Sequence, residues 1–178
     1  STENERDGAT FRVLAVDQLD QQQQRQQQLA LEARDELFQR LSARLTEVLT
    51  ESGATSAIQV CKSDAPRLAS EVSDQFGVSI GRTSHRLRNP DNSAPAWARQ
   101  LVQQQVADPQ IVALQDRRLG VLLPIYLKAA CVLCHGPEEE IVPDVRASLV
   151  AHYPQDQATG FREGDLRGWF WVEIPVQD

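Results

Sequence analysis

Cys131 and Cys134 are separated by two residues, and His135 follows the second cysteine directly. On a helix these positions lie on one face, because residues i, i+3 and i+4 are neighbours there. The pattern is typical of c-type haem attachment, in which two thiols add to the haem vinyl groups and the imidazole lies beneath the iron. A redox-active cysteine pair or half of a zinc site would use the same residues, and both alternatives stay open.

A third cysteine, Cys61, and the absence of methionine narrow the choice of a second iron ligand. Thioether bonds would consume Cys131 and Cys134, which leaves Cys61 as an unpaired thiol that needs a reason. Without methionine, the usual methionine ligand is excluded. The candidates that remain are water, a tyrosine, and the side chains of Cys61, His85, His152, Lys62 and Lys128. A zinc site would instead combine the three cysteines with one histidine.

The composition indicates one globular domain. The chain has 178 residues, enough to bury a core around a cofactor. Its net charge of −7 argues against nucleic acid or an anionic membrane as the partner. The longest apolar run, Leu119 to Leu127, contains Pro124 and is far shorter than the roughly 20 residues that a membrane span needs. No integral membrane span is therefore expected.

The haem interpretation also predicts where the protein works. No signal peptide precedes Ser1, so we expect a mature or trimmed form. Covalent haem attachment in bacteria normally takes place outside the cytoplasm. We therefore expect a periplasmic or otherwise exported protein.

A helical pattern runs from about Phe11 to Leu49, with a glutamine-rich first part. Apolar residues recur in it at helical spacing, namely Leu37, Phe38, Leu41, Leu45, Val48 and Leu49. We expect this stripe to pack on the domain, with Gly53 as the C-cap. A coiled coil that forms a homodimer is the alternative, although the glutamine run lacks a sustained heptad. We divide the chain into an N-terminal helical segment, residues 1–52, and a haem-binding domain, residues 53–178.

The remaining residues predict alternating strands and helices. Strands are expected at 57–61, 78–84, 111–114, 120–127 and 166–176, the last by strict alternation of side chains. Helices are expected from Ser63 or Asp64 to Gly77, between 93 and 108, and from Glu138 onward. This order predicts an α+β fold with an antiparallel sheet. Cys61 would lie where a strand passes into a helix, whose first N–H groups favour a thiolate.

Five groups of residues match one pattern, in order, over roughly residues 30–176. They are Ala57-Ile58-Gln59-Val60-Cys61-Lys62 with Ala65-Pro66; Gly81-Arg82-Thr83-Ser84 with Arg88-Asn89-Pro90 and Trp97; Cys131-Val132-Leu133-Cys134-His135-Gly136; Tyr153-Pro154 with Asp156 and Ala158-Thr159-Gly160; and Gly164-Asp165-Leu166-Arg167-Gly168. The chain thereby resembles the bacterial family of single-haem c-type domains with a PAS-like fold. Members of that family occur alone and as sensory modules of histidine kinases and chemoreceptors.

The resemblance implies a PAS-like antiparallel sheet flanked by helices, with one covalent haem c in its pocket. It also implies an unusual pair of axial ligands. Carried over to this chain, His135 is one ligand of the iron and Cys61, from the first strand, is the other.

Further candidates for the haem pocket come from the basic and aromatic residues. Three arginines fall within seven residues, at 82, 86 and 88, inside an acidic protein. They suggest a nearby anion, and we expect Arg82 and Arg88 to bind haem propionates; a solvated turn is the competing interpretation. We also expect Trp97 and Tyr126 in the haem pocket.

Two roles fit such a haem domain. The first is a sensory domain that responds to redox state or to a small gas ligand, CO or NO. The second is a low-potential electron carrier with a redox partner, in which both ligands stay bound. A peroxidase-like enzyme would need an open iron position with His85 or His152 as acid/base, and we do not expect an enzyme.

Overall fold

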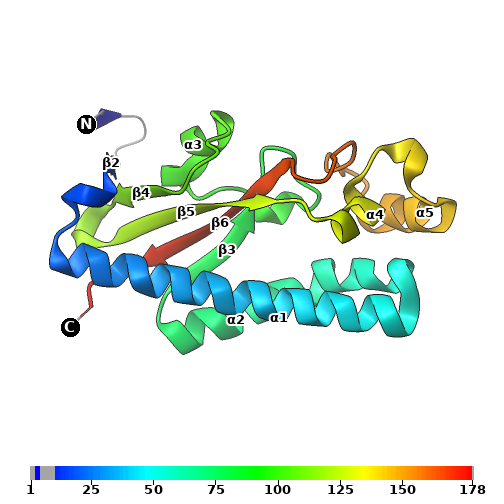
Figure 1. Ribbon diagram of the computed structural model, residues 1–178, viewed down its shortest axis with the longest axis horizontal. Coiled ribbons are helices and arrows are strands. Elements are labelled where there is room, and N and C mark those ends of the chain that lie inside the picture. The colour runs from blue at the N-terminus through cyan, green and yellow to red at the C-terminus, as the bar shows by residue number, and fades with distance from the viewer. Residues whose placement is uncertain (1–2, 5–10, 178) are drawn as a thin grey trace.

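The computed structural model of the chain describes residues 3–4 and 11–177. It contains a six-stranded antiparallel sheet with the strand order β1-β2-β4-β5-β6-β3 (Figure 1). The strands are β1 (Glu3–Asn4), β2 (Phe11–Leu14), β3 (Ser79–Thr83), β4 (Gln110–Ala113), β5 (Leu119–Tyr126) and β6 (Leu166–Ile174). The helices are α1 (Gln21–Gln59), α2 (Ala65–Phe76), α3 (Arg99–Gln103), α4 (Val132–His135) and α5 (Pro143–His152). This is the predicted α+β, PAS-like architecture with a long N-terminal helix.

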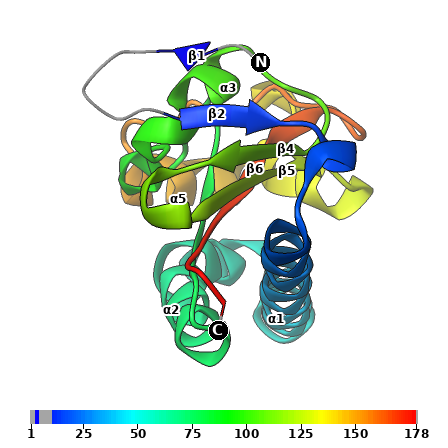
Figure 2. The ribbon, with the colours of Figure 1, turned by 90° about the vertical axis from the view of Figure 1, so that its left-hand side faces the viewer.

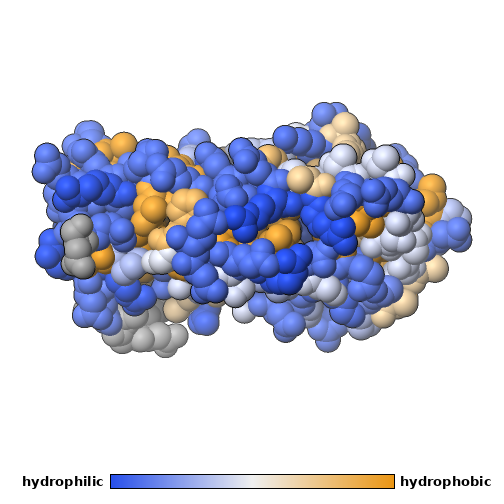
Figure 3. Space-filling model, turned by 90° about the horizontal axis from the view of Figure 1, so that it is seen from below, coloured by the Kyte–Doolittle hydropathy of each residue, from blue (hydrophilic) through white to orange (hydrophobic). Residues whose placement is uncertain are grey.

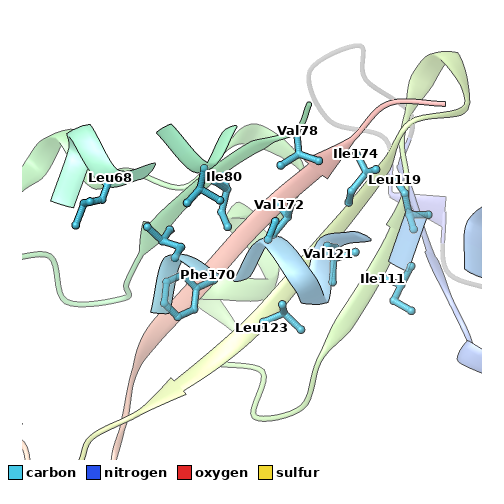
Figure 4. Close-up of a cluster of buried hydrophobic side chains, with 14 of the residues drawn as sticks. Leu68, Val78, Ile80, Ile111, Leu119, Val121, Leu123, Phe170, Val172 and Ile174 are labelled. Carbon is cyan, nitrogen blue, oxygen red and sulfur yellow. The ribbon is translucent and has the colours of Figure 1, made fainter. Parts of the chain in front are cut away.

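Alternation along the strands gives the sheet two apolar faces. Figure 2 shows α1 and α2 together beneath one face and α3 on the other side of the sheet. The face toward α1 and α2 carries the larger core, with Leu119, Val121, Leu123, Phe170, Val172 and Ile174 of the central strands (Figure 4). The opposite face buries Leu122 and Trp169 against Trp97 and α3.

Helix α1 begins at a capping box and ends its first, straight part at Gly53. The Asp20 carboxylate accepts from the Gln23 backbone N–H at 2.8 Å, and the Gln23 side chain accepts from the Asp20 N–H at 3.0 Å. Gly53 has φ 81° and ψ 176°, which no helix contains, and Figure 1 shows the chain turning back there. The predicted helix end at Gly53 is therefore confirmed, and residues 54–59 form a short returning helix.

Buried residues of α1 join this helix to the sheet. Ala30, Ala33 and Leu37 have no exposed surface and belong to the same core as the central strands. The N-terminal segment that the sequence set apart at residue 52 thus shares one core with the rest of the domain.

Three local predictions differ from the structure. Residues Phe11–Leu14 form an edge strand paired with β4 and not the start of a helix, because sheet pairing overrides a weak helical pattern. Residues 57–61 are helical and not a strand, since a short apolar run does not distinguish the two. The Glu138–Glu140 segment is one 3-10 turn, and α5 begins at Pro143, a residue suited to the first helical position.

Other predicted elements are confirmed. Strand β3, the β4–β5 hairpin and β6 lie where the sequence placed them, and α2 ends at Gly77 in the left-handed conformation (φ 65°, ψ 36°). Pro124 lies beyond Leu122, the last residue of β5 that pairs with β4, so the missing N–H of the proline interrupts no bond on that side.

Candidate functional site

Four residues from distant parts of the chain line one cavity. Cys131, Cys134 and His135 reach it from α4 and the turn before it, and Cys61 reaches it from the other side of the chain's helical hairpin. All three cysteines are free and partly exposed. Burial raises the pKa of the Cys134 thiol. The local spacing of the CxxCH segment therefore has the expected result, three potential ligands around one space.

The His135 imidazole is prepared to act as a ligand. Its Nδ1 lies 2.7 Å from the Ala158 carbonyl oxygen, which only accepts, so Nδ1 carries the proton. Burial lowers the pKa of His135 well below its ordinary value, and the charges of Arg167 and Arg88 lower it further. The ring is therefore neutral, with the lone pair of Nε2 available for a metal. A backbone carbonyl that fixes the tautomer is common behind metal-binding histidines.

The second half of α1 forms an apolar wall of the cavity. Four residues at helical spacing line it, namely Phe38, Leu41, Leu45 and Leu49. Opposite them lie Ile125, Leu127, Leu133 and Phe170. A space with apolar walls and a few polar groups suits a large, flat, apolar ligand.

Cationic side chains define the polar end of the cavity. Arg82, Arg88 and Arg167 all line it, whereas no Asp or Glu among the described residues does. The buried Arg88 donates to Asp156 at 3.0 Å and to the carbonyls of Cys134 and Ala158, so its role is largely structural.

Two of these arginines have donors left for a ligand. Arg82 makes no hydrogen bond or ion pair with any residue that the structure describes. Arg167 donates through Nη1 to Ser84 Oγ at 2.7 Å and to the Arg86 carbonyl at 3.1 Å. Burial, together with Arg88 and Arg82, lowers the pKa of Arg167 to about 10. The cluster therefore has an excess of buried positive charge, which an anionic ligand would offset.

Cys61 lies in a π-helical turn, Val60–Asp64, that connects α1 to α2. Single π turns inside helices occur frequently at functional sites. The turn is anchored by Asp64, which accepts from Arg44 Nε of α1 at 2.7 Å. Because helix continues through Cys61 on both sides, the expectation of free helix-start N–H groups around this thiol is wrong.

The two tyrosines line the cavity in different ways. Tyr126, 47% exposed, donates its hydroxyl to the Ala107 carbonyl at 2.5 Å. Tyr153 is only 5% exposed, and burial raises its pKa to about 12, so its hydroxyl stays protonated at neutral pH. Of the cavity residues, Arg167 and Tyr153 were not predicted as site residues, although both lie in the segments that carried the family resemblance.

Comparison with known proteins assigns the chain to a family. A family model named Tll0287-like matches residues 12–175, which is most of the chain. The chain belongs to the Tll0287-like family. The family resemblance drawn from the sequence is thereby confirmed.

A solved structure supports the same assignment at the level of the fold. The crystal structure of the cyanobacterial heme-protein Tll0287 is similar with a TM-score of 0.62 and 24% sequence identity. The alignment covers 84% of this chain and 95% of that one. None of the curated proteins matches.

Some predicted residues of this Tll0287-like chain lie away from the cavity. Trp97 packs on the opposite face of the sheet, over Gly120, and donates Nε1 to Glu173 at 2.9 Å. His85 packs edge-on against Trp169, with ring centroids 5.7 Å apart, and His152 bonds to the Ser148 carbonyl of its own helix. Neither histidine lines the cavity.

The zinc alternative has no support in the geometry. Within the described part of this Tll0287-like chain, no group of three His, Cys, Asp or Glu side chains is placed to hold a metal ion. A structural zinc site needs four such ligands in a tetrahedron. No helix in residues 3–4 and 11–177 has the length and apolar character of a membrane span.

The face of the Tll0287-like domain that carries α1 and α2 is mostly hydrophilic, with apolar side chains visible in narrow strips (Figure 3). Phe38 is the one strongly exposed large apolar residue described on α1, at 37%. The homodimer through this helix stays a prediction.

Proposed function

We propose that this protein is a c-type haem protein, with one haem bound to Cys131 and Cys134 and its iron held between His135 and Cys61. The observation that carries the proposal is the meeting of these four residues in one cavity, although Cys61 is 70 positions from Cys131 in the sequence. A solved structure of the same fold, that of Tll0287, is described as a heme-protein.

Each wall of the cavity has a role in this proposal. The thiols of Cys131 and Cys134 form the thioethers, and Nε2 of His135 binds the iron while the Ala158 carbonyl orients the ring. The apolar residues of α1 cover one side of the macrocycle. Arg82 and Arg167 have free donors for the propionates, whereas Arg88 already binds Asp156 and two carbonyls.

The haem would supply one-electron chemistry and, at an open position, binding of CO or NO. A Cys61 thiolate donates charge to ferric iron and lowers its reduction potential relative to a methionine. On reduction this hold weakens, and Cys61 takes up a proton and leaves. Because Cys61 lies in a π-helical turn between α1 and α2, its release would be felt by both helices, and not by a strand as the sequence suggested. We therefore propose a redox- or gas-responsive sensory domain, exported from the cytoplasm.

The alternative role is a low-potential electron carrier in which Cys61 stays bound in both redox states. An enzyme is not part of the proposal, since the site offers no acid/base histidine beside its ligands: His85 and His152 both lie elsewhere.

The test compares ferric and ferrous spectra, with and without CO, in three purified proteins: the wild type, Cys61→Ala and Ser63→Ala. Ser63 is an exposed neighbour in the same turn and serves as the matched control. We expect a thiolate-type ferric spectrum that Cys61→Ala abolishes and Ser63→Ala retains. An unchanged ferric spectrum in Cys61→Ala would overturn the ligand assignment.

Reduction then separates the two roles. Rapid CO binding by the reduced wild type indicates that Cys61 leaves, as a sensor requires. A reduced protein that excludes CO until Cys61 is replaced indicates an electron carrier. Acid extraction tests attachment, because covalent haem stays with the chain and should be released from a protein lacking Cys131 and Cys134.

A further inference from the structure

Tyr153 has an unpaired hydroxyl in the interior. The residue is 5% exposed and packs in an apolar cluster with Ile58, Ile141, Val145 and Leu149. Its hydroxyl makes no hydrogen bond with any of the residues that the structure describes, yet the side chain lines the cavity. Buried tyrosine hydroxyls usually have a partner. The partner of this one must therefore come from the cavity.

Tyr126 gives a direct contrast. It lines the same cavity, but its hydroxyl already donates to the Ala107 carbonyl and its side chain is half-exposed. Of the two tyrosines, only Tyr153 lacks a partner on the chain.

The position of Tyr153 indicates which cavity group it faces. It packs on Ile58, one helical turn before Cys61, and its ring centroid is 6.0 Å from the Lys62 Nζ. A charge on Cys61 is, after burial, the next cause that raises the pKa of Tyr153, so the two polar ends lie within electrostatic range. Cys134 also contacts this cluster. Tyr153 is thus beside the Cys61 turn.

We infer that the Tyr153 hydroxyl donates a hydrogen bond to the Cys61 sulfur and so acts as a positioning residue for the second iron ligand. The inference rests on the proposed function, because it needs Cys61 to be a ligand. A hydrogen bond to a ligand sulfur withdraws charge from it, and bonds of this kind tune the reduction potentials of metal–thiolate sites. Tyr153 would therefore raise the reduction potential above that of an unassisted thiolate.

The experiment is a spectroelectrochemical titration of the holoprotein in the wild type, Tyr153→Phe and Tyr126→Phe. Loss of the donor leaves more charge on the sulfur and favours ferric iron. At a fixed potential we expect the ferric-to-ferrous ratio of Tyr153→Phe to rise about tenfold, which is ~59 mV for a one-electron couple. Tyr126→Phe should change it less than twofold. A Tyr153→Phe potential equal to that of the wild type, or a rise in potential, would overturn the inference.

Two further variants show whether the effect passes through Cys61. In a Cys61→Ala background, adding Tyr153→Phe should leave the potential unchanged, because no sulfur remains to receive the hydrogen bond. An equal shift in both backgrounds would mean that Tyr153 acts on the haem generally, and the inference would be wrong. If Cys61→Ala itself changes neither spectrum nor potential, the ligand assignment fails together with the inference. If Cys61→Ala changes them and Tyr153→Phe does not, only the inference fails.

Discussion

The two halves of α1 contribute to the molecule in different ways. In the first half, Gln26, Ala30, Ala33 and Leu37 are almost fully buried against the sheet. From residue 41 to residue 52 no side chain is buried, and Leu41, Leu45 and Leu49 line the cavity instead. The first half of the helix is thus part of the protein core. The second half has an apolar face that the protein alone does not cover.

The difference shows how the domain divides stability and binding. Residues that hold the first half should affect folding whether or not a ligand is present. Residues of the second half should matter mainly with a ligand, because a group that binds only the folded state stabilises what it contacts. In the haem-free protein, amides of residues 41–52 should exchange with solvent faster than those of residues 26–37.

The largest expected effect is that of Leu37→Ala, in the first half. The side chain has no exposed surface, so its truncation leaves a cavity in the main core. We expect a loss of about 2–5 kcal/mol in the free energy of unfolding. Urea unfolding of the haem-free and haem-bound proteins should give similar losses; a loss confined to one form would contradict the proposed division of α1.

Gln26→Ala tests the polar attachment of the same half. The buried Gln26 amide donates to the carbonyls of Arg117, Ile174 and Pro175 at 3.0–3.2 Å. Its removal leaves buried acceptors without a donor and should cost about 1–3 kcal/mol. Gln28→Ala, at an exposed position two residues later, is the control and should change stability by less than about 0.5 kcal/mol in the same urea experiment.

The pH dependence of haem-free stability tests the cavity side. Burial lowers the pKa of His135 and of His85, so the unfolded chain binds more protons than the folded one below about pH 6.5. Stability should therefore be complete above neutrality and fall with acidification, by at most about 1.4 kcal/mol per pH unit for each histidine. His135→Asn should reduce this slope and leave the part due to His85. An identical slope in the variant would show that His135 does not contribute.

Leu45→Ala, in the second half, should have the smallest effect on the haem-free protein. The side chain is only partly buried there, and we expect a change below about 1 kcal/mol. With haem bound, the same variant should lose part of the added stability and regain fast amide exchange around residue 45. An effect on the haem-free protein as large as that of Leu37→Ala would remove the contrast between the halves.

Local patterns predicted those features that neighbouring residues determine. The CxxCH spacing, the left-handed Gly77 and the alternation of β6 were all visible in the sequence, because each depends on contacts within a few positions. The count of cysteines singled out Cys61, but not its π-helical turn, since its apolar neighbours fit either a strand or a helix.

Features that depend on distant pairing could not be predicted in the same way. Arg167 reaches the cavity because β6 pairs with β3, which sets it beside Ser84 and Arg86. Trp97 was expected in the pocket, but the face of the sheet on which a helix packs is decided by tertiary structure. Tyr153 gained its interest only from a hydroxyl without a partner, which a sequence does not reveal.

The turn at Gly53 decides where the second half of α1 leads. An added Cβ there would meet no atom within 4 Å, so space is not what requires glycine; the backbone angles alone do. Had the helix continued straight, the rise of 1.5 Å per residue would carry Cys61 roughly 12 Å past this point. The reversal brings the sulfur back by a similar length instead. A single peptide unit without a side chain thus determines whether the third thiol meets the other two or lies out of their reach.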